Sequence, residues 1–326
     1  MQPENVFLPN PNAFTVFGHE IRWYAIFILI GMVGGVAIAC RSAKKYGWTV
    51  DDIIDVALVA LPSAVVGARM YYVIFKWDYY AQHPADIIKI WEGGLGIYGG
   101  IIAGIVAGMI YCKVKKRNIW ELLDIGAPSI AFGQAVGRWG NFTNQEAFGA
   151  VVTNPSLQGF PASVYIQADG QFHYATFFYE SAWCALIVVA LLLLRKRFRH
   201  RGDTILCYAM LYSAERSIVE GLRMDSLYIG TIRVSQALSA ILFVGIVAFF
   251  VIRFFKERKN PMPITNKLHP DYVEIQEEED EPLDVGAKHA ATPMPPMRIE
   301  DEKLEAAPWE NEEHVIDEDD EEKHDD

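Results

Sequence analysis

A polar cluster closes a long apolar stretch in the middle of the chain, and its residue types are those that handle anions and protons. The apolar segment begins near Ile119, and the cluster at its end comprises Arg138, Asn141, Asn144, Gln145 and Glu146. At a rise of about 1.5 Å per residue, Arg138 lies about 28 Å along a helix that starts at Ile119, close to the far edge of a hydrocarbon core about 30 Å thick. Ionisable groups at membrane depth are costly and indicate a functional site.

The helical period groups these side chains. On one continuous helix, Asn141 and Gln145 lie within about 60° of Arg138, and Glu146 lies about 80° away. A simple alternative is an Arg–Glu pair that only pins two helices together. The amides and glycines of residues 133–149 exceed what such a pair needs, so a functional site is the favoured interpretation.

The elements that must position this cluster are apolar helices. Four of the connections after the apolar segments are rich in Lys and Arg, and the other connections are poor in them. By the positive-inside rule, this alternation predicts an all-α polytopic membrane protein with its N-terminus outside and its C-terminus in the cytoplasm. Seven segments are long enough to span a bilayer, namely residues 21–40, 52–75, 95–112, 119–140, 176–194, 204–222 and 231–252.

The net charge of −12 averages two different compositions. Residues 271–326 hold 23 acidic and 4 basic residues, a net charge of −19, whereas residues 1–270 hold 18 acidic and 25 basic residues, a net charge of +7. We therefore expect a membrane domain over residues 1–259 and a disordered acidic cytoplasmic tail over residues 260–326. A scaffold that recruits partners through this tail is a weaker alternative, because it leaves the polar cluster unexplained.

Several other kinds of site are not indicated. Residues 1–20 lack a basic start and an apolar core, so we expect no cleavable signal peptide. The four cysteines are scattered without metal-ligand spacing, which predicts small apolar fillers. No phosphate-binding glycine loop or Ser-His-Asp arrangement is evident. We expect no metal and no organic cofactor.

The intramembrane polar groups are not spread evenly through the bilayer. Arginine suits bidentate recognition of phosphate, so a cation-rich pocket at headgroup depth indicates a site for an anionic phospholipid. A carrier that binds the same cargo is the main alternative, but a transporter more often places polar groups near the midplane. We also expect no charged residues in the inner halves of the spans. With the predicted topology, the outer half holds Tyr24, Arg69, Tyr98, Arg138, Glu146, Tyr179, Glu180, Arg216, Glu220 and Arg223.

Residues 137–149, Gly-Arg-Trp-Gly-Asn-Phe-Thr-Asn-Gln-Glu-Ala-Phe-Gly, resemble the signature of bacterial prolipoprotein diacylglyceryl transferases, Gly-Arg-x-Gly-Asn-Phe-x-Asn-x-Glu-x-x-Gly. The resemblance extends over roughly residues 10–255 and does not include the acidic tail. Further matches follow the family's order at Arg22-Trp23-Tyr24, Gly67-Ala68-Arg69, Trp91 to Gly94, Tyr179-Glu180 and Arg216 to Glu220.

The resemblance implies an enzyme of the bacterial cytoplasmic membrane that carries out the first step of lipoprotein maturation. Such an enzyme transfers the diacylglyceryl group of phosphatidylglycerol to the lipobox cysteine thiol of a preprolipoprotein. A thioether forms and glycerol phosphate is released. The implied partners are therefore a phospholipid and a signal peptide, with no nucleic acid.

The family pattern also implies residue roles. Arg138 should bind the lipid phosphate, with Asn141, Glu146 and Gly149 completing that site. Arg216 should be the second essential cation, and Tyr24 should lie near the headgroup. The remaining expected substrate-binding residues are Arg69, Tyr212, Glu220 and Arg223.

The group that accepts the thiol proton stays open between alternatives. Glu146 is preferred as the acceptor, Tyr98 and Glu220 are alternatives, and Glu146 could instead hold Arg138 in place. Some members of the family have a histidine where this chain has Tyr98. The family often shows His-Pro-Thr or His-Pro-Ser before the Tyr-Glu pair, whereas His173 stands one residue earlier here.

Overall fold

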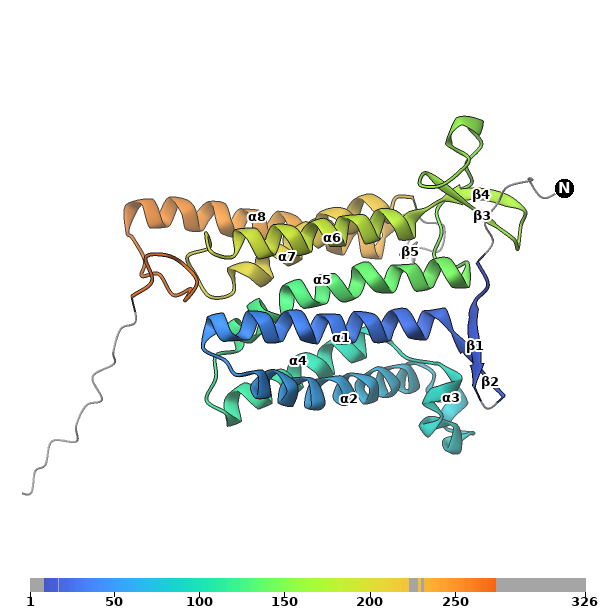
Figure 1. The fold of residues 1–326 in the computed structure, drawn as a ribbon, viewed down its shortest axis with the longest axis horizontal. Coiled ribbons are helices and arrows are strands. Elements are labelled where there is room, and N and C mark those ends of the chain that lie inside the picture. Colours follow the sequence, from blue (N-terminus) through green and yellow to red (C-terminus); the bar gives the residue numbers. More distant parts are fainter. Residues whose placement is uncertain (1–8, 17, 223–227, 230–231, 274–326) are drawn as a thin grey trace, which may run out of the picture. The chain divides into compact units, whose positions relative to one another are not determined.

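The computed structural model describes residues 9–16, 18–222, 228–229 and 232–273. In this part of the chain, seven helices of 17 residues or more form the body of the fold (Figure 1). Each expected apolar segment falls on one of them. They are α1 (Trp23–Ala43), α2 (Val50–Phe75), α4 (Ile97–Val114), α5 (Ile119–Asn144), α6 (Thr176–Leu194), α7 (Asp203–Val219) and α8 (Val234–Lys259).

Length and composition single out five of the described helical stretches as able to cross a membrane. They are Trp23–Tyr46, Val50–Phe75, Ile97–Val114, Thr176–Leu194 and Ser235–Lys259. The first of these includes η1 (Lys44–Tyr46), a turn of 3-10 helix that continues α1. α5 and α7 each carry several buried polar residues, which lowers their hydropathy.

The local sequence determines where α2 and α5 begin and where α5 ends. α2 begins at a capping box in which Thr49 and Asp52 bind each other's backbone N–H groups at 3.0 and 2.9 Å. The Asn118 side chain accepts the Trp120 N–H at 2.8 Å and starts α5. Gln145 adopts a left-handed conformation with a φ of 51° and ends α5.

α5 is the central element, because it packs against α1, α6 and α7. Ala127 and Ala131 on α5 are fully buried and face Ile187 and Leu191 of α6 in one apolar cluster. By contrast, α8 exposes large apolar side chains along its length. Exposed apolar faces of this extent suit contact with lipid rather than with water.

α2 and α4 pack together through glycine. A Cβ atom added at Gly99 would lie 2.3 Å from the Gly67 carbonyl oxygen, so only glycine permits this approach of the two backbones. Gly67 and Gly99 therefore permit the close packing of α2 and α4.

Short β-hairpins correct the expectation of an all-α fold. β1 (Asn12–Val16) pairs with β2 (His19–Arg22), β3 (Ser163–Ile166) with β4 (Gln171–Tyr174), and β5 (Tyr228–Ile229) with β6 (Ile232–Arg233). All lie at the end of the bundle where α1 begins. Backbone groups there lack helical partners, and antiparallel pairing satisfies them locally.

Short helices occupy two of the connections. Between α2 and α4, the chain forms α3 (Trp77–Tyr80) and the short helices η2 (Pro84–Ile88) and η3 (Ile90–Glu92). The loop after α5 contains η4 (Pro155–Leu157).

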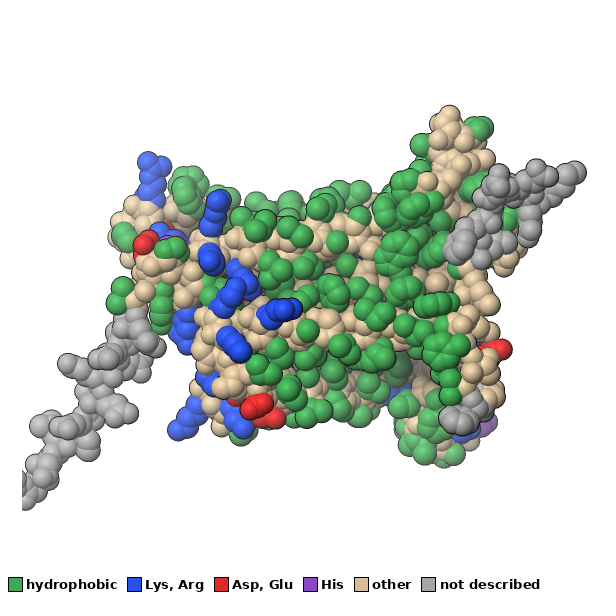
Figure 2. Space-filling view, viewed as in Figure 1, with side chains coloured by type: hydrophobic (Ala, Val, Ile, Leu, Met, Phe, Trp, Pro, Cys, Tyr) green, Lys and Arg blue, Asp and Glu red, His purple; other side chains and the backbone are tan. Residues whose placement is uncertain are grey.

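Lys and Arg side chains gather at the opposite end (Figure 2), and buried acids lie among them. The expectation of no charge in the inner halves of the spans is therefore wrong. Asp124 on α5 accepts the Gly202 and Ile205 N–H groups at 2.8 and 3.0 Å and so caps the start of α7. Glu121 pairs with Arg201 at 3.1 Å. These acids are satisfied within the protein, which explains how they are tolerated there.

Residues 260–273, grouped with the tail in the sequence analysis, have defined contacts with the bundle. The Asn266 side chain is fully buried and donates to the carbonyl oxygens of Arg195 at 3.0 Å and Phe198 at 2.8 Å. Lys267 pairs with Glu121 at 3.2 Å. Composition did not reveal this segment, because single buried side chains rather than an apolar run hold it.

Asn266→Ala should lower the free energy of unfolding by about 1–3 kcal/mol, because two buried carbonyl groups lose their donor. Thermal unfolding in detergent measures this change. Asn260→Ala is the matched control, since Asn260 is exposed. Equal midpoints for the two variants would contradict a structural role for the segment.

Candidate functional site

One carboxylate joins the two arginines that the sequence analysis placed at the centre of the site. Glu180 on α6 forms an ion pair with Arg138 on α5 and another, at 3.4 Å, with Arg216 on α7. Arg216 also pairs with Glu220 at 2.7 Å, one helical turn further along the chain. Arg138 and Arg216 therefore belong to a single cluster at the end of α5 and α7 that lies away from the basic end.

Burial differs between the acids and the bases of this cluster. The side chains of Glu180 and Glu220 are only 2% and 3% exposed, whereas those of Arg138 and Arg216 are 20% and 19% exposed. Buried carboxylates thus hold two guanidinium groups that remain partly accessible. A guanidinium has five N–H donors, so the accessible edges can bind a second anion such as a phosphate.

The second half of the motif leaves the helix. Ala147 shares the left-handed conformation of Gln145, with a φ of 55°, so the helical angles expected for Gln145 and Glu146 do not apply. The Gln145 side chain donates to the Tyr165 carbonyl oxygen at 3.1 Å and ties the turn to β3. Glu146 is exposed and accepts a hydrogen bond from Asn144 at 3.2 Å. The ion-pair partner of Arg138 is Glu180, so the alternative in which Glu146 holds Arg138 lacks support in this geometry.

Gly149 lies in a tight space beside β4. A Cβ atom there would meet the Tyr174 Cβ atom at 2.8 Å and the Leu222 carbonyl oxygen at 3.2 Å. The Gly149 N–H donates to the Tyr174 carbonyl oxygen at 3.0 Å. The motif therefore ends on a glycine because a side chain would push the turn away from α6 and α7.

Three further expected residues lie on α1, α5 and α7. The Tyr24 ring lies against Gly140, where an added Cβ atom would be 2.4 Å from it. Asn141 is partly buried, and its carbonyl oxygen accepts the Glu146 N–H at 3.0 Å. Tyr212 stacks on Tyr208, one turn away on α7, with ring centroids 5.8 Å apart.

Arg69 and Tyr98 have other surroundings. Arg69 is buried and donates to four backbone carbonyl oxygens, those of Asp86, Ile87, Gly93 and Gly94, at 2.5–3.0 Å. It therefore holds the loop between α2 and α4. Tyr98 is half exposed, and its ring faces Tyr71 on α2, with centroids 6.3 Å apart. Arg223, the last expected residue, lies outside the described residues.

The β3–β4 hairpin carries a buried histidine with two acceptor partners. His173 is 2% exposed, and its Nδ1 and Nε2 atoms lie 2.7 Å from the Gly149 carbonyl oxygen and from an Asp169 carboxylate oxygen. Both ring nitrogens therefore have an oxygen atom within hydrogen-bond distance. His173 thus links the end of the motif to the hairpin.

Comparison with known proteins decides the family. A model described as prolipoprotein diacylglyceryl transferase matches residues 11–252. The chain is 44% identical to the phosphatidylglycerol–prolipoprotein diacylglyceryl transferase of Bacillus licheniformis over 255 residues, which cover 77% of this chain and 94% of that protein. The chain belongs to the prolipoprotein diacylglyceryl transferase family.

Two other relatives with the same name support this membership. That of Bacillus velezensis is 43% identical over 252 residues, covering 76% of this chain and 93% of that protein. That of Limosilactobacillus reuteri is 42% identical over 254 residues, covering 76% and 92%. The predicted family is confirmed, and membership together with the apolar helices makes the chain a multi-pass membrane transferase.

Glu180 is the residue whose importance sequence reasoning underestimated. It was noted as half of the Tyr179-Glu180 pair that matches the transferase family, yet it was not assigned to the site. Arg233, whose Nη1 atom donates to the Glu220 carbonyl oxygen at 2.5 Å, was not noted at all. In the described part of the chain, no three His, Cys, Asp or Glu side chains are grouped to hold a metal ion.

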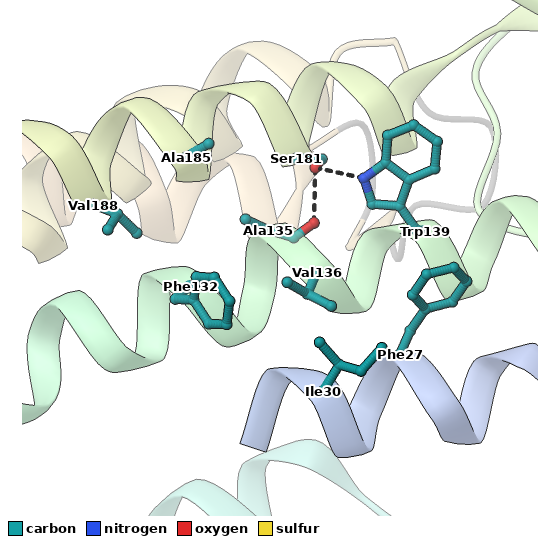
Figure 3. A pocket seen from close by; sticks show the side chains of 9 residues that line it. All are labelled: Phe27, Ile30, Phe132, Ala135, Val136, Trp139, Ser181, Ala185 and Val188. Atoms are coloured by element: carbon teal, nitrogen blue, oxygen red, sulfur yellow. Dashed lines mark hydrogen bonds between the residues drawn. The ribbon is translucent and has the colours of Figure 1, made fainter. Parts of the chain in front are cut away.

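An apolar groove of about 430 Å³ adjoins the part of α5 nearest the cluster, between α1 and α6 (Figure 3). At its end, Trp139 donates to the Ser181 hydroxyl at 3.1 Å, and Ser181 donates to the Ala135 carbonyl oxygen at 2.7 Å. Trp139 and Ser181 directly follow Arg138 and Glu180 in the sequence, so the groove starts at the level of the Arg138–Glu180 ion pair. Phe132 and Val188 line its deeper part.

The contact between His173 and Asp169 should make the order of the hairpin depend on pH. Burial raises the pKa of Asp169, but the hydrogen bonds from His173 and from the Gln171 N–H, together with the charge of His173, outweigh it, and the net pKa lies below the usual value. The pairing therefore persists at neutral pH and is lost as pH falls through that lowered pKa.

Protection factors for the Gly149 amide measure this effect. We expect protection to fall as pH falls through the lowered pKa of Asp169. Asp169→Asn should remove this acid-side loss, because an amide does not titrate in this range. Asp51→Asn, at the basic end, is the control. An unchanged pH profile in Asp169→Asn would show that the Asp169 carboxylate does not control the order of the hairpin.

Proposed function

We propose that this chain transfers the diacylglyceryl group of phosphatidylglycerol to the lipobox cysteine of preprolipoproteins, in the bacterial cytoplasmic membrane. The observation that carries this proposal is the Glu180 carboxylate that joins Arg138 and Arg216. The names of the relatives support the same donor and acceptor.

The reaction is a displacement at carbon. The cysteine thiolate attacks the glycerol carbon that bears the phosphate ester, so a C–S bond forms and the C–O bond breaks. The electron pair of that bond stays on the phosphate oxygen, and glycerol phosphate leaves. The thiol proton must go to a base before or during the attack, since the thiolate is the nucleophile.

Arg138 and Arg216 stabilise the charge that grows on the phosphate. Their guanidinium groups are held in advance by Glu180 and Glu220, so little reorganisation is needed when the bond breaks. One preorganised donor of this kind contributes about 10²–10³-fold to the rate. Tyr24, Asn141 and Gly149 shape the surroundings of the phosphate, and Tyr212 borders Arg216 from α7.

Glu146 is the proposed proton acceptor. It is exposed, and its bond to Asn144 leaves the carboxylate open to a substrate. Glu220 is bound to Arg216, which makes it less suited to this role. Tyr98 lies beside Tyr71 on α2 and is a weaker alternative.

The topology that goes with this function has seven spans, an outer N-terminus and a cytoplasmic C-terminus. The gathering of Lys and Arg at the end of the bundle away from the cluster supports this orientation (Figure 2). The cluster then lies at the depth of the outer headgroups. The acidic tail beyond residue 273 is proposed to be a solvated cytoplasmic appendage that transfer does not require.

Arg138→Ala should lower the rate of transfer about 10²–10³-fold, while the protein still folds because Glu180 keeps its pair with Arg216. Purified variants are assayed with phosphatidylglycerol and a lipobox peptide, and the peptide thioether is detected by mass. Arg258→Ala, an exposed arginine at the end of α8, is the matched control. Near-normal thioether formation by Arg138→Ala would remove this residue from the mechanism. If the unaltered protein binds phosphatidylglycerol but forms no peptide thioether, the chain is a lipid carrier instead of a transferase.

Glu146→Gln should lower transfer about 10²–10⁴-fold at neutral pH, because the thiol loses its base. The deficit should shrink as pH rises towards the ordinary thiol pKa of about 8.5, where the peptide forms thiolate unaided. Glu20→Gln, another exposed carboxylate at the same end of the fold, controls for charge. A deficit that stays constant with pH would argue against proton transfer by Glu146.

A further inference from the structure

A second apolar groove lies at the basic end, between α4 and α5. It encloses about 450 Å³. The last turns of α4 and the start of α5 line it with Val106, Met109, Ile110, Cys112, Lys113, Arg117 and Ile119.

The groove exists because α4 and α5 diverge after a short connection. α4 packs closely along α2, where Gly67 and Gly99 let the backbones approach, but it contacts α5 only sparsely. Only residues 115–118 join the two helices. The space between α4 and α5 is therefore open to the molecules that surround the protein.

The lining matches a hydrocarbon chain. Val106, Met109 and Ile110 are each about half exposed, and in a membrane protein such side chains meet lipid. From Lys113 to Val106, the groove follows α4 for about 10 Å. An acyl chain lying along the helix would cover these side chains.

The mouth of the groove is cationic. Arg117 is paired with Asp52 at 2.7 Å, and Lys115 is paired with Asp55 at 3.7 Å. Lys113 has no ion pair among the residues that the structure describes, and it lines the groove. One available ammonium group thus stands where the headgroup of a lipid in this groove would lie.

We propose that the groove between α4 and α5 binds an anionic phospholipid of the leaflet at the basic end. One acyl chain lies along Val106, Met109 and Ile110, and the phosphate pairs with Lys113. Basic pockets between membrane helices bind anionic headgroups in this way. This lipid is not the transfer substrate, since Arg138 lies about 28 Å further along α5 than Ile119.

Photo-crosslinking in bilayer nanodiscs tests the proposal. The full chain is placed in phosphatidylcholine with a trace of phosphatidylserine that bears a diazirine on its acyl chain, and labelled peptides are mapped by mass. The same diazirine chain on phosphatidylcholine reports ordinary lipid contact. Because phosphatidylserine is not the donor named for the relatives, labelling at the transfer site does not confuse the result.

We expect the anionic probe to label residues 106–119 about fivefold more than the neutral probe. Lys113→Gln should abolish this preference, and Val106→Trp should lower labelling by both probes because it fills the groove. Lys256→Gln on α8 and Ile102→Trp, exposed on α4 outside the groove, should leave the preference unchanged. Equal labelling by the two probes in the unaltered chain, or an unchanged preference in Lys113→Gln, overturns the proposal.

Discussion

The shared carboxylate of Glu180 is the constraint on which the arrangement of the central helices depends. A carboxylate in an apolar interior must be paired, and this one is paired with guanidinium groups from two different helices. α5, α6 and α7 are thereby held at one level. Arg138 and Arg216, which repel each other, remain close because the anion lies between them.

α5 uses charge differently at its two ends. At the basic end, Glu121 and Asp124 are buried and fully engaged by Arg201 and by backbone N–H groups. At the other end, Arg138 is partly exposed although its partner is buried. The first arrangement stabilises the junction with α7. The second leaves hydrogen-bond donors for a ligand, and this difference in exposure separates a structural pair from a binding site.

The motif of this family is divided between two kinds of structure. Its first half lies on α5 and directs Arg138 into the cluster. Its second half is a turn with left-handed residues, and it ends on Gly149 against β4. His173 binds the Gly149 carbonyl oxygen from the hairpin. The loop between α5 and α6 thus contributes to the shape of the site.

Much of this could be predicted from the sequence, because hydrophobic segments, basic connections and a long motif are local patterns. Residues 137–149 indicated the family, and the apolar segments indicated the long helices. Residue roles that depend on contacts with distant parts of the chain were harder to predict from the sequence. Arg69 donates to four carbonyl oxygens of a loop 17–25 residues away, and the sequence did not reveal these contacts. The buried contacts of Asn266 were missed because the pattern around it is that of a tail.

The sequence by itself determined which segments are helical, which end of the bundle is basic and to which family the chain belongs. These features follow from composition, periodicity and motif, which need no knowledge of neighbours. Only the tertiary structure decided that Glu180 joins Arg138 to Arg216, that the Glu146 side chain accepts a hydrogen bond from Asn144 and that α4 leaves a groove beside α5. Such relations depend on which faces of distant helices meet and how deeply each is buried, and the order of residues along the chain does not contain that information directly.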